Sequence, residues 1–260
     1  AYVPGGDADT DLAIARQPVM ARYLRQGLNE NQSMENSSAQ LAALETEDIA
    51  ALSSVQIGSF ATASLPGLGS AHIVALSTDN IRGLTTVQLR ALSSSQIAAL
   101  QTSDFAALST GQLGGLGATQ GAGLSTEQLA TLDSAEIGKL STAFMQAIST
   151  AAITGLGTQQ IPGLGTAQLA AWTTSVQIQA LESADLAQLS SAQVKSLSSA
   201  QLGYLSSAQL AALSGAATGV LGTNTIASLN SADLAALTSA QVAGLSTAQL
   251  QALSSAQEIG

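Results

Sequence analysis

From residue 36 to residue 260, apolar and polar positions recur in a pattern of eight residues. Counted from the first apolar residue, position one is usually Leu and positions two and three are mostly Ser or Thr. Position five is usually Gln, position six is aliphatic, and positions seven and eight are small, as in residues 197–204 (LSSAQLGY). The chain holds 28 such repeats, one of which, residues 172–180, has nine residues. A short fixed period is typical of a repeat array, so we predict a solenoid rather than a globular enzyme.

The spacing of the apolar positions, five residues and then three, indicates one short helix in each octad. Strict alternation would predict a strand, and a continuous α-helix would rotate its apolar stripe by about 80° at each octad. The phrase Ser-x-x-Gln is a capping box, in which the hydroxyl at position two and the Gln side chain at position five satisfy the first backbone amides. Positions one and six then form a hydrophobic staple around about two helical turns.

We therefore predict an all-α solenoid or superhelix of very short helices, one per octad, over residues 36–260. A β-solenoid is the alternative; the Ser and Thr content favours it, and the Ala, Gln and Leu content disfavours it. Where position two is Glu45, Gln101 or Glu182, we expect the cap to shift to the Thr or Ser at position three. We expect the position-three hydroxyls to bond to carbonyls of a neighbouring unit, and small residues at positions seven and eight to let backbones approach.

Several repeats depart from the pattern. The nine-residue repeat predicts a bulge or kink, and its Trp172 stands on a core position, where it either fills a gap or stacks on a ligand. Pro66 and Pro162 predict early helix ends. Gly121 and Thr218 replace the aliphatic residue of position six and predict weak spots in the core.

The first 35 residues lack the repeat and predict an N-terminal helical cap or a docking arm. Asp7, Asp9 and Asp11 alternate with other residues, a spacing that calcium-binding loops use, although the Gly and Glu that an EF-hand requires are absent. The alternative is a group of acids at a helix N-terminus. No other cofactor is predicted.

Composition limits the classes of function. Charged residues make up 9% of the chain and hydrophobic residues 46%, which is too apolar for a disordered segment. The net charge of −10 argues against nucleic acid and anionic lipid as partners. Polar residues interrupt every octad, so no membrane span is predicted. The single histidine, His72, stands at position five, where we expect it to replace a capping Gln; nothing in the sequence predicts an enzyme.

The phrase Leu-Ser/Thr-Ser/Thr-x-Gln-aliphatic, as in residues 245–252 (LSTAQLQA), resembles the repeat arrays of large exported bacterial adhesin-like surface proteins. The resemblance covers residues 36–260 and implies an extracellular or cell-surface location. It supplies no site residues, and it does not extend to the first 35 residues.

These features favour a structural repeat protein that forms a rod or self-assembling filament segment of an extracellular or cell-surface assembly, in adhesion or a matrix. The final octad has Glu258 where an aliphatic residue belongs and no polar cap after it. This predicts either a longer array or an end covered by another subunit, and hence head-to-tail self-association. The alternative is a binding module that presents a Ser, Thr and Gln face to a cell-surface glycan or to ice.

Overall fold

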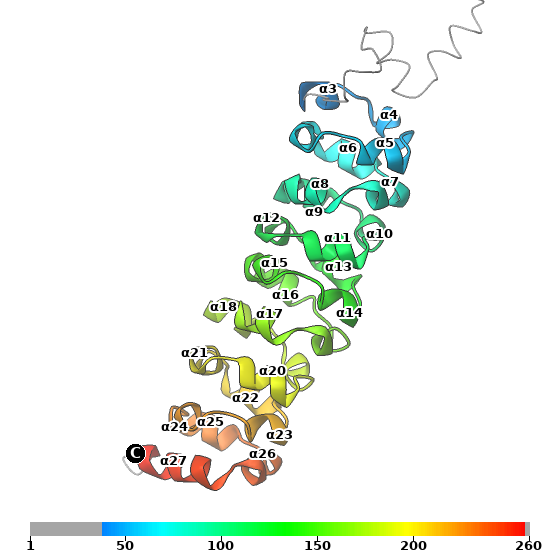
Figure 1. Cartoon of the computed structure of the whole chain (residues 1–260). Helices are drawn as coiled ribbons and strands as arrows, with labels where there is room; N and C mark the ends of the chain where they lie inside the picture. The colour runs from blue at the N-terminus through cyan, green and yellow to red at the C-terminus, as the bar shows by residue number, and fades with distance from the viewer. Residues whose placement is uncertain (1–37, 258–260) are drawn as a thin grey trace, which may run out of the picture. The chain divides into compact units, whose positions relative to one another are not determined.

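The computed structural model describes residues 38–257, and within this range every regular element is a helix (Figure 1). The chain divides into two compact units, Ala1–Leu108 and Ser109–Gly260, whose described parts are residues 38–108 and 109–257. The all-α prediction is confirmed for the described residues, and the β-solenoid alternative is wrong for them. The predicted N-terminal cap or docking arm, residues 1–35, lies outside the described range.

The first unit contains nine described helices, one for each octad. They are α3 (Ser38–Ala42), α4 (Thr46–Ala50), α5 (Ser54–Gly58), η1 (Thr62–Gly67), α6 (Ser70–Ala75), α7 (Thr78–Gly83), α8 (Thr86–Ala91), α9 (Ser94–Ala99) and α10 (Thr102–Phe105).

The second unit continues the same arrangement within residues 109–257. Its first helices are α11 (Thr110–Gly115), α12 (Ala118–Ala122), α13 (Thr126–Ala130), α14 (Ser134–Ile137), α15 (Thr142–Ala147), α16 (Thr150–Ile153), η2 (Ile161–Gly163), α17 (Thr166–Ala170) and α18 (Ser175–Gln179). The remaining helices are α19 (Ser183–Leu186), α20 (Ser191–Ser196), α21 (Ser199–Gly203), α22 (Ser207–Ala212), α23 (Gly215–Thr218), α24 (Thr223–Ala227), α25 (Ser231–Ala236), α26 (Ser239–Gly244) and α27 (Thr247–Gln257).

Many helices begin where the sequence predicts, with a capping box between positions two and five. In α9 the Gln96 amide donates to the Ser93 hydroxyl at 3.2 Å, and the Ser93 amide donates to Gln96 Oε1 at 2.8 Å. Leu92 and Ile97, which flank the cap at positions one and six, are both buried. Apart from α27, the α-helices have four to six residues, so they are shorter than the two turns we expected.

The cap does not shift where position two is acidic or amide-bearing, so that expectation is wrong. Glu45, Gln101 and Glu182 are themselves the N-cap residues of α4, α10 and α19. At Glu45 and Glu182 the backbone amide still donates to the carboxylate at position five, at 3.2 Å and 3.3 Å. The register is therefore fixed by the buried residues and by position five, and the capping side chain itself is dispensable.

Proline changes the helix type in its two octads. Pro66 lies inside the 3₁₀ helix η1, and Pro162 lies near the start of the 3₁₀ helix η2. Proline has no amide hydrogen to complete an α-helical turn, which explains the change. Leu65 and Ile161, at position six of these octads, nevertheless stay fully buried.

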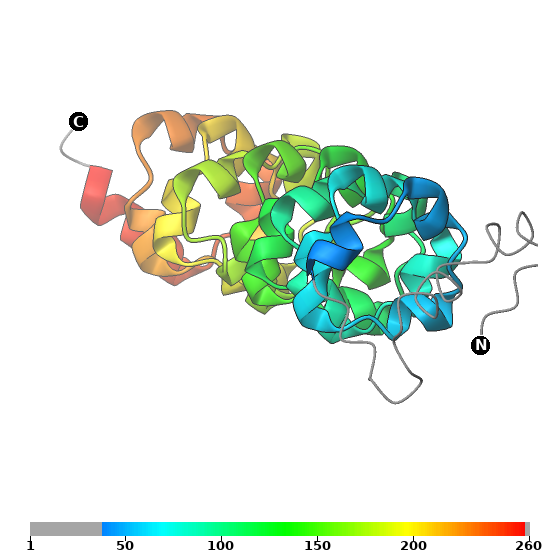
Figure 2. The same cartoon turned by 90° about the horizontal axis from the view of Figure 1, so that it is seen from above.

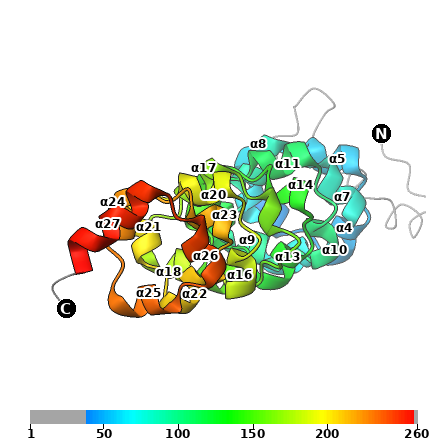
Figure 3. The ribbon, with the colours of Figure 1, turned by 90° about the horizontal axis from the view of Figure 1, so that it is seen from below.

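Helices pack against the helix three octads later in the chain. In the first unit α5 contacts α7, and α6 contacts α9; in the second, α12 contacts α15, and α24 contacts α27 (Figures 1 and 3). Seen from above, the helices of the first unit follow one another around a common axis (Figure 2). Three octads, or 24 residues, thus make one turn in each unit.

Small residues let adjacent turns touch through their backbones, as predicted. A methyl group added to Gly83 would overlap the Ser54 carbonyl, and one added to Gly163 would overlap the Ser134 carbonyl. Both carbonyls belong to serines at position three. We therefore attribute the uniformity of position three to the small size of the residues that fit at these contacts. The predicted hydrogen bonds from position-three hydroxyls to carbonyls of another octad form in some repeats. The Thr126 hydroxyl, for example, donates to the Ala151 carbonyl at 2.9 Å.

The basic residues of positions seven and eight lie in solvent. As expected, these side chains are exposed to solvent; they are Arg82, Arg90, Lys139 and Lys195.

Candidate functional site

The most regular polar feature is a set of buried glutamine side chains at position five, which we call the glutamine ladder. Ladder side chains whose Nε2 donates to backbone carbonyls of the preceding turn include Gln88, Gln96, Gln160, Gln168, Gln177, Gln193, Gln201, Gln209, Gln241 and Gln249.

Gln96 shows the geometry. Its Oε1 accepts from the Ser93 amide, while its Nε2 donates at 2.8 Å to both the Leu65 and the Leu68 carbonyls. One side chain thus caps its own helix and clamps two carbonyls, 31 and 28 residues back. Because buried carbonyls are costly to leave unpaired, this clamp stabilises the contact between turns.

Other residues at position five reproduce the clamp. His72 Nδ1 accepts from the Gly69 amide at 3.0 Å, and its Nε2 lies 2.9 Å from the Leu44 carbonyl. The predicted role of His72 as a capping substitute is confirmed, with the second contact in addition. Asn80 likewise accepts from the Ser77 amide and donates to the Leu52 carbonyl.

At residue 144 the ladder is replaced by a different solution. Phe144 has no donor, and the Ser141 hydroxyl donates instead to the Leu116 carbonyl at 2.7 Å. A methyl group added to Gly121, in the preceding turn, would overlap the Phe144 backbone. Gly121, which we expected to be a weak spot, thus permits close approach of α12 to α15 around a fully buried Phe144.

Thr218, the second expected weak spot, is also fully buried. Its hydroxyl donates to the Ser214 carbonyl at 3.1 Å, and its own carbonyl accepts from Gln249 Nε2 at 3.3 Å. The polar atoms of this residue are therefore paired within the core.

The extra residue of the nine-residue repeat lengthens the link before α18, which residues 173 and 174 form. Trp172 is fully buried and its indole N–H donates to the Met145 carbonyl at 2.8 Å, which confirms the gap-filling core role. The clamps of Gln193 and Gln201 reach back 32 and 29 residues, one more than elsewhere. The ladder therefore keeps its carbonyl partners across the extra residue.

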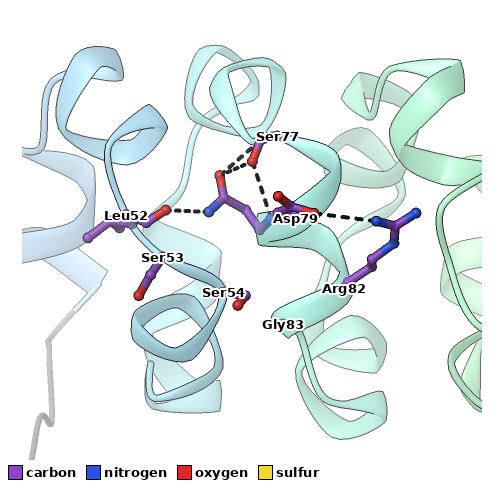
Figure 4. Close-up of a pocket in the computed structure, with 8 residues that line it drawn as sticks. Leu52, Ser53, Ser54, Ser77, Asp79, Arg82 and Gly83 are labelled. Atoms are coloured by element: carbon purple, nitrogen blue, oxygen red, sulfur yellow. Dashed lines mark hydrogen bonds and ion pairs between the residues drawn. The ribbon is translucent and has the colours of Figure 1, made fainter.

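A pocket of about 460 Å³ lies between α5 and α7 in the first unit (Figure 4). Its lining residues are Leu52, Ser53, Ser54, Ser77, Asp79, Asn80, Arg82 and Gly83.

The charged groups of this pocket are an exposed ion pair. Arg82 Nη1 lies 3.3 Å from Asp79 Oδ1, and both side chains are mostly in solvent, so the pair contributes little free energy. The Ser53 and Ser77 hydroxyls donate to the side-chain oxygens of Gln56 and Asn80. The pocket offers hydrogen-bonding groups already used by the repeat, and no nucleophile beside a base.

Residues 38–257 contain no group of three His, Cys, Asp or Glu residues placed to hold a metal ion. The calcium candidates Asp7, Asp9 and Asp11 lie outside the described residues. No described helix is long and apolar enough to cross a membrane.

The hydrogen bonds from glutamine Nε2 to the preceding turn were not predicted, although the choice of residue at position five indicates them. An acid can cap as well as Gln, yet position five holds Gln in 16 repeats and Asp or Glu in five. A carboxylate can cap but has no N–H to donate. The bias toward Gln therefore indicates that a donor is required.

Comparisons with known proteins find matches in both the array and the N-terminal segment. The model of the ALTTAQ repeat matches segments spread over the array, at residues 41–78, 67–102, 75–110, 97–134, 105–142, 137–174, 178–215 and 220–259. The model of the T3SS EscN ATPase C-terminal domain matches residues 1–43. Over 44 residues the chain is 64% identical to a flagellum-specific ATP synthase of Pseudomonas aeruginosa; the match covers 17% of this chain and 10% of that protein.

Proposed function

This chain belongs to the ALTTAQ repeat family, and from its repeated contacts we propose that it is a structural protein, a rod or filament segment of an extracellular or cell-surface assembly. The observation that carries the proposal is the glutamine ladder. The same clamp recurs between turns wherever position five holds one of the ladder glutamines, so an array can lengthen by repeating one kind of contact. Adhesion or matrix building would use such length.

Self-association end to end is part of this proposal. At position six, Leu210 and Ile226 are 2% and 0% exposed, whereas Val242 and Leu250, in the last described turn, are 47% and 46% exposed. In inner turns the octad three repeats later covers such residues. An octad turn of a second copy has the side chains to cover this face, and head-to-tail contacts of this kind give open filaments.

Sedimentation velocity and electron microscopy at rising concentration test the proposal. We expect assemblies that lengthen with concentration, and we expect the V242S/L250S variant to remain monomeric. V55S/V87S is the matched control, because it removes two exposed valines at position four, away from this face. A wild-type chain that stays monomeric at all concentrations would remove the filament proposal.

The binding-module alternative receives less support from the contacts. The hydroxyls at position two accept from helix amides, and several also donate to Gln or Asn oxygens, as at Ser109 and Gln112. A glycan or ice surface would have to be recognised by groups already engaged in the fold. A glycan-array screen and a thermal-hysteresis measurement, if positive, would restore this alternative.

The match at residues 1–43 supports a second candidate function. The array is then a module carried by a type III secretion or flagellar ATPase, placed after a segment of its C-terminal domain. Peptide mapping of the protein isolated from its source cells tests this. Peptides from the rest of such an ATPase in the same polypeptide support the module; an N-terminus at Ala1 in the isolated protein contradicts it.

A further inference from the structure

Position five holds an aspartate in place of glutamine at Asp48, Asp104, Asp185 and Asp233, and two of these aspartates, Asp104 and Asp185, are buried. Asp104 in α10 and Asp185 in α19 stand at position five, and each side chain is 3% exposed. Asp104 lies in the first unit and Asp185 in the second, so the two sites provide independent examples of the same replacement.

An ionised aspartate at this position lacks the donor that the clamp requires. The offsets of 28 and 31 residues that hold for Gln96 assign the Leu76 and Ile73 carbonyls to Asp104. Asp104 Oδ2 is buried and has no hydrogen-bond partner. A carbonyl facing a carboxylate repels it, whereas a carbonyl facing a protonated carboxyl accepts its O–H.

Asp185 is arranged in a similar way. Its Oδ2 accepts from the Glu182 amide at 3.3 Å, which is the capping half of the usual contact. The offset of 29 residues seen for Gln193, whose clamp also spans the nine-residue repeat, assigns the Leu156 carbonyl to Asp185. A hydrogen bond from the Asp185 side chain to the Leu156 carbonyl again requires a protonated carboxyl group.

Asn80 demonstrates that a side chain of this length reaches the carbonyl. Its Nδ2 donates to the Leu52 carbonyl while its Oδ1 accepts from the Ser77 amide. A protonated aspartic acid has the same shape and the same pairing of one donor with one acceptor.

Few charges surround the two groups within their own units. α10 contacts α7, whose Asp79 and Arg82 pair with each other in solvent. α19 contacts α22, which has no charged residue, and carries Glu182 beside Asp185.

We propose that Asp104 and Asp185 are acid-operated clamps. When protonated, each donates its O–H to the position-one carbonyl of the preceding turn; when ionised, it leaves that carbonyl without its clamp. Mild acid thus tightens the array at these two turns, and neutral pH loosens it there.

The direction of the pH dependence follows from the environment of each group. Burial raises the pKa of Asp104 above its ordinary value of 3.8. Burial also raises the pKa of Asp185, with the Glu182 charge acting in the same direction and the hydrogen bond from the Glu182 amide opposing it. Because each folded pKa exceeds the unfolded one, this contribution to stability is complete below the unfolded value and is lost as pH rises through the folded value.

Thermal unfolding of wild type and D104N/D185N from pH 4 to pH 8 tests the proposal. Asparagine supplies the donor at every pH. We expect the variant to melt about 2–4 °C above wild type at neutral pH and the gap to close toward acid. A gap of constant size across the range, or no gap, overturns the proposal, because a purely steric effect of the substitution does not vary with pH.

N80D provides the converse test at a third site, in a separate variant. It should acquire the same pH dependence, with a melting temperature that falls as pH rises relative to wild type. D79N, which alters an exposed aspartate of the same helix, is the control and should leave the profile unchanged. An N80D profile parallel to that of wild type contradicts the proposal.

Discussion

Residues 92–99 in the first unit and residues 140–147 in the second solve the same problem in different ways. In the first segment, Gln96 caps its helix and clamps two carbonyls of the preceding turn. In the second, Phe144 occupies that position and the Ser141 hydroxyl reaches the Leu116 carbonyl. The comparison teaches that pairing this carbonyl and filling the core are separate tasks, and that a single residue need not perform both.

The largest expected effect tests the filled core. F144Q removes a buried aromatic ring and should lower the free energy of unfolding by about 3–5 kcal/mol. In the double variant G121L/F144Q, α12 and α15 must still separate to admit the added Cβ at position 121, but the leucine supplies apolar volume to replace the ring, so we expect it to recover part of that loss. Local hydrogen exchange in α12 and α15 measures this, because repeats unfold in parts.

The single variant G121L is the control for this pair. It should destabilise the array by itself, since its side chain overlaps the Phe144 backbone. If the double variant is as unstable as the sum of the two single variants, Gly121 and Phe144 are not a coupled pair.

A smaller effect tests the donor. Q96E keeps the capping oxygen and replaces the donor with a carboxylate that faces the Leu65 and Leu68 carbonyls. We expect a loss of about 2 kcal/mol at neutral pH, which is the cost of leaving buried polar groups unpaired. S93A is the matched control, because it removes the capping hydroxyl that accepts from the Gln96 amide and leaves the Gln96 side chain in place.

Hydrogen exchange of the α9 and η1 amides measures the Q96E effect. Equal losses for Q96E and S93A would indicate that capping, rather than the clamp between turns, accounts for the stability.

The smallest effect tests the substitute donor. S141A removes both a cap and the bond to the Leu116 carbonyl, whereas S149A removes a hydroxyl that accepts from the Ala152 amide. We expect S141A to cost about 1 kcal/mol more than S149A in chemical denaturation. Equal costs would show that the Leu116 carbonyl does not depend on Ser141.

Much of the local structure could be predicted because it depends on neighbouring residues. Ser93 and Gln96 are three residues apart, so their capping box is readable, and Leu92 and Ile97 follow as the staple. The roles of His72 and Trp172 were also predictable from their positions in the octad. The donor role of Gln96 was missed because its carbonyl partners, at Leu65 and Leu68, are distant in sequence.

The compensations around the irregular repeats could not be predicted for the same reason. In the sequence Gly121 stands where a core residue is missing. Its role becomes clear only in the structure, where the backbone of Phe144, 23 residues later, lies against it. Glu45, Gln101 and Glu182 are poor caps by residue type, yet the helices start there because buried residues in other turns fix the register.

The sequence by itself determined that each octad forms one capped helix with two buried positions, since caps and staples act within eight residues. Only the tertiary structure decided that three octads complete a turn. An eight-residue period is compatible with many numbers of octads per turn. The choice is made by how closely the small residues let backbones approach and by which carbonyls a glutamine side chain can reach.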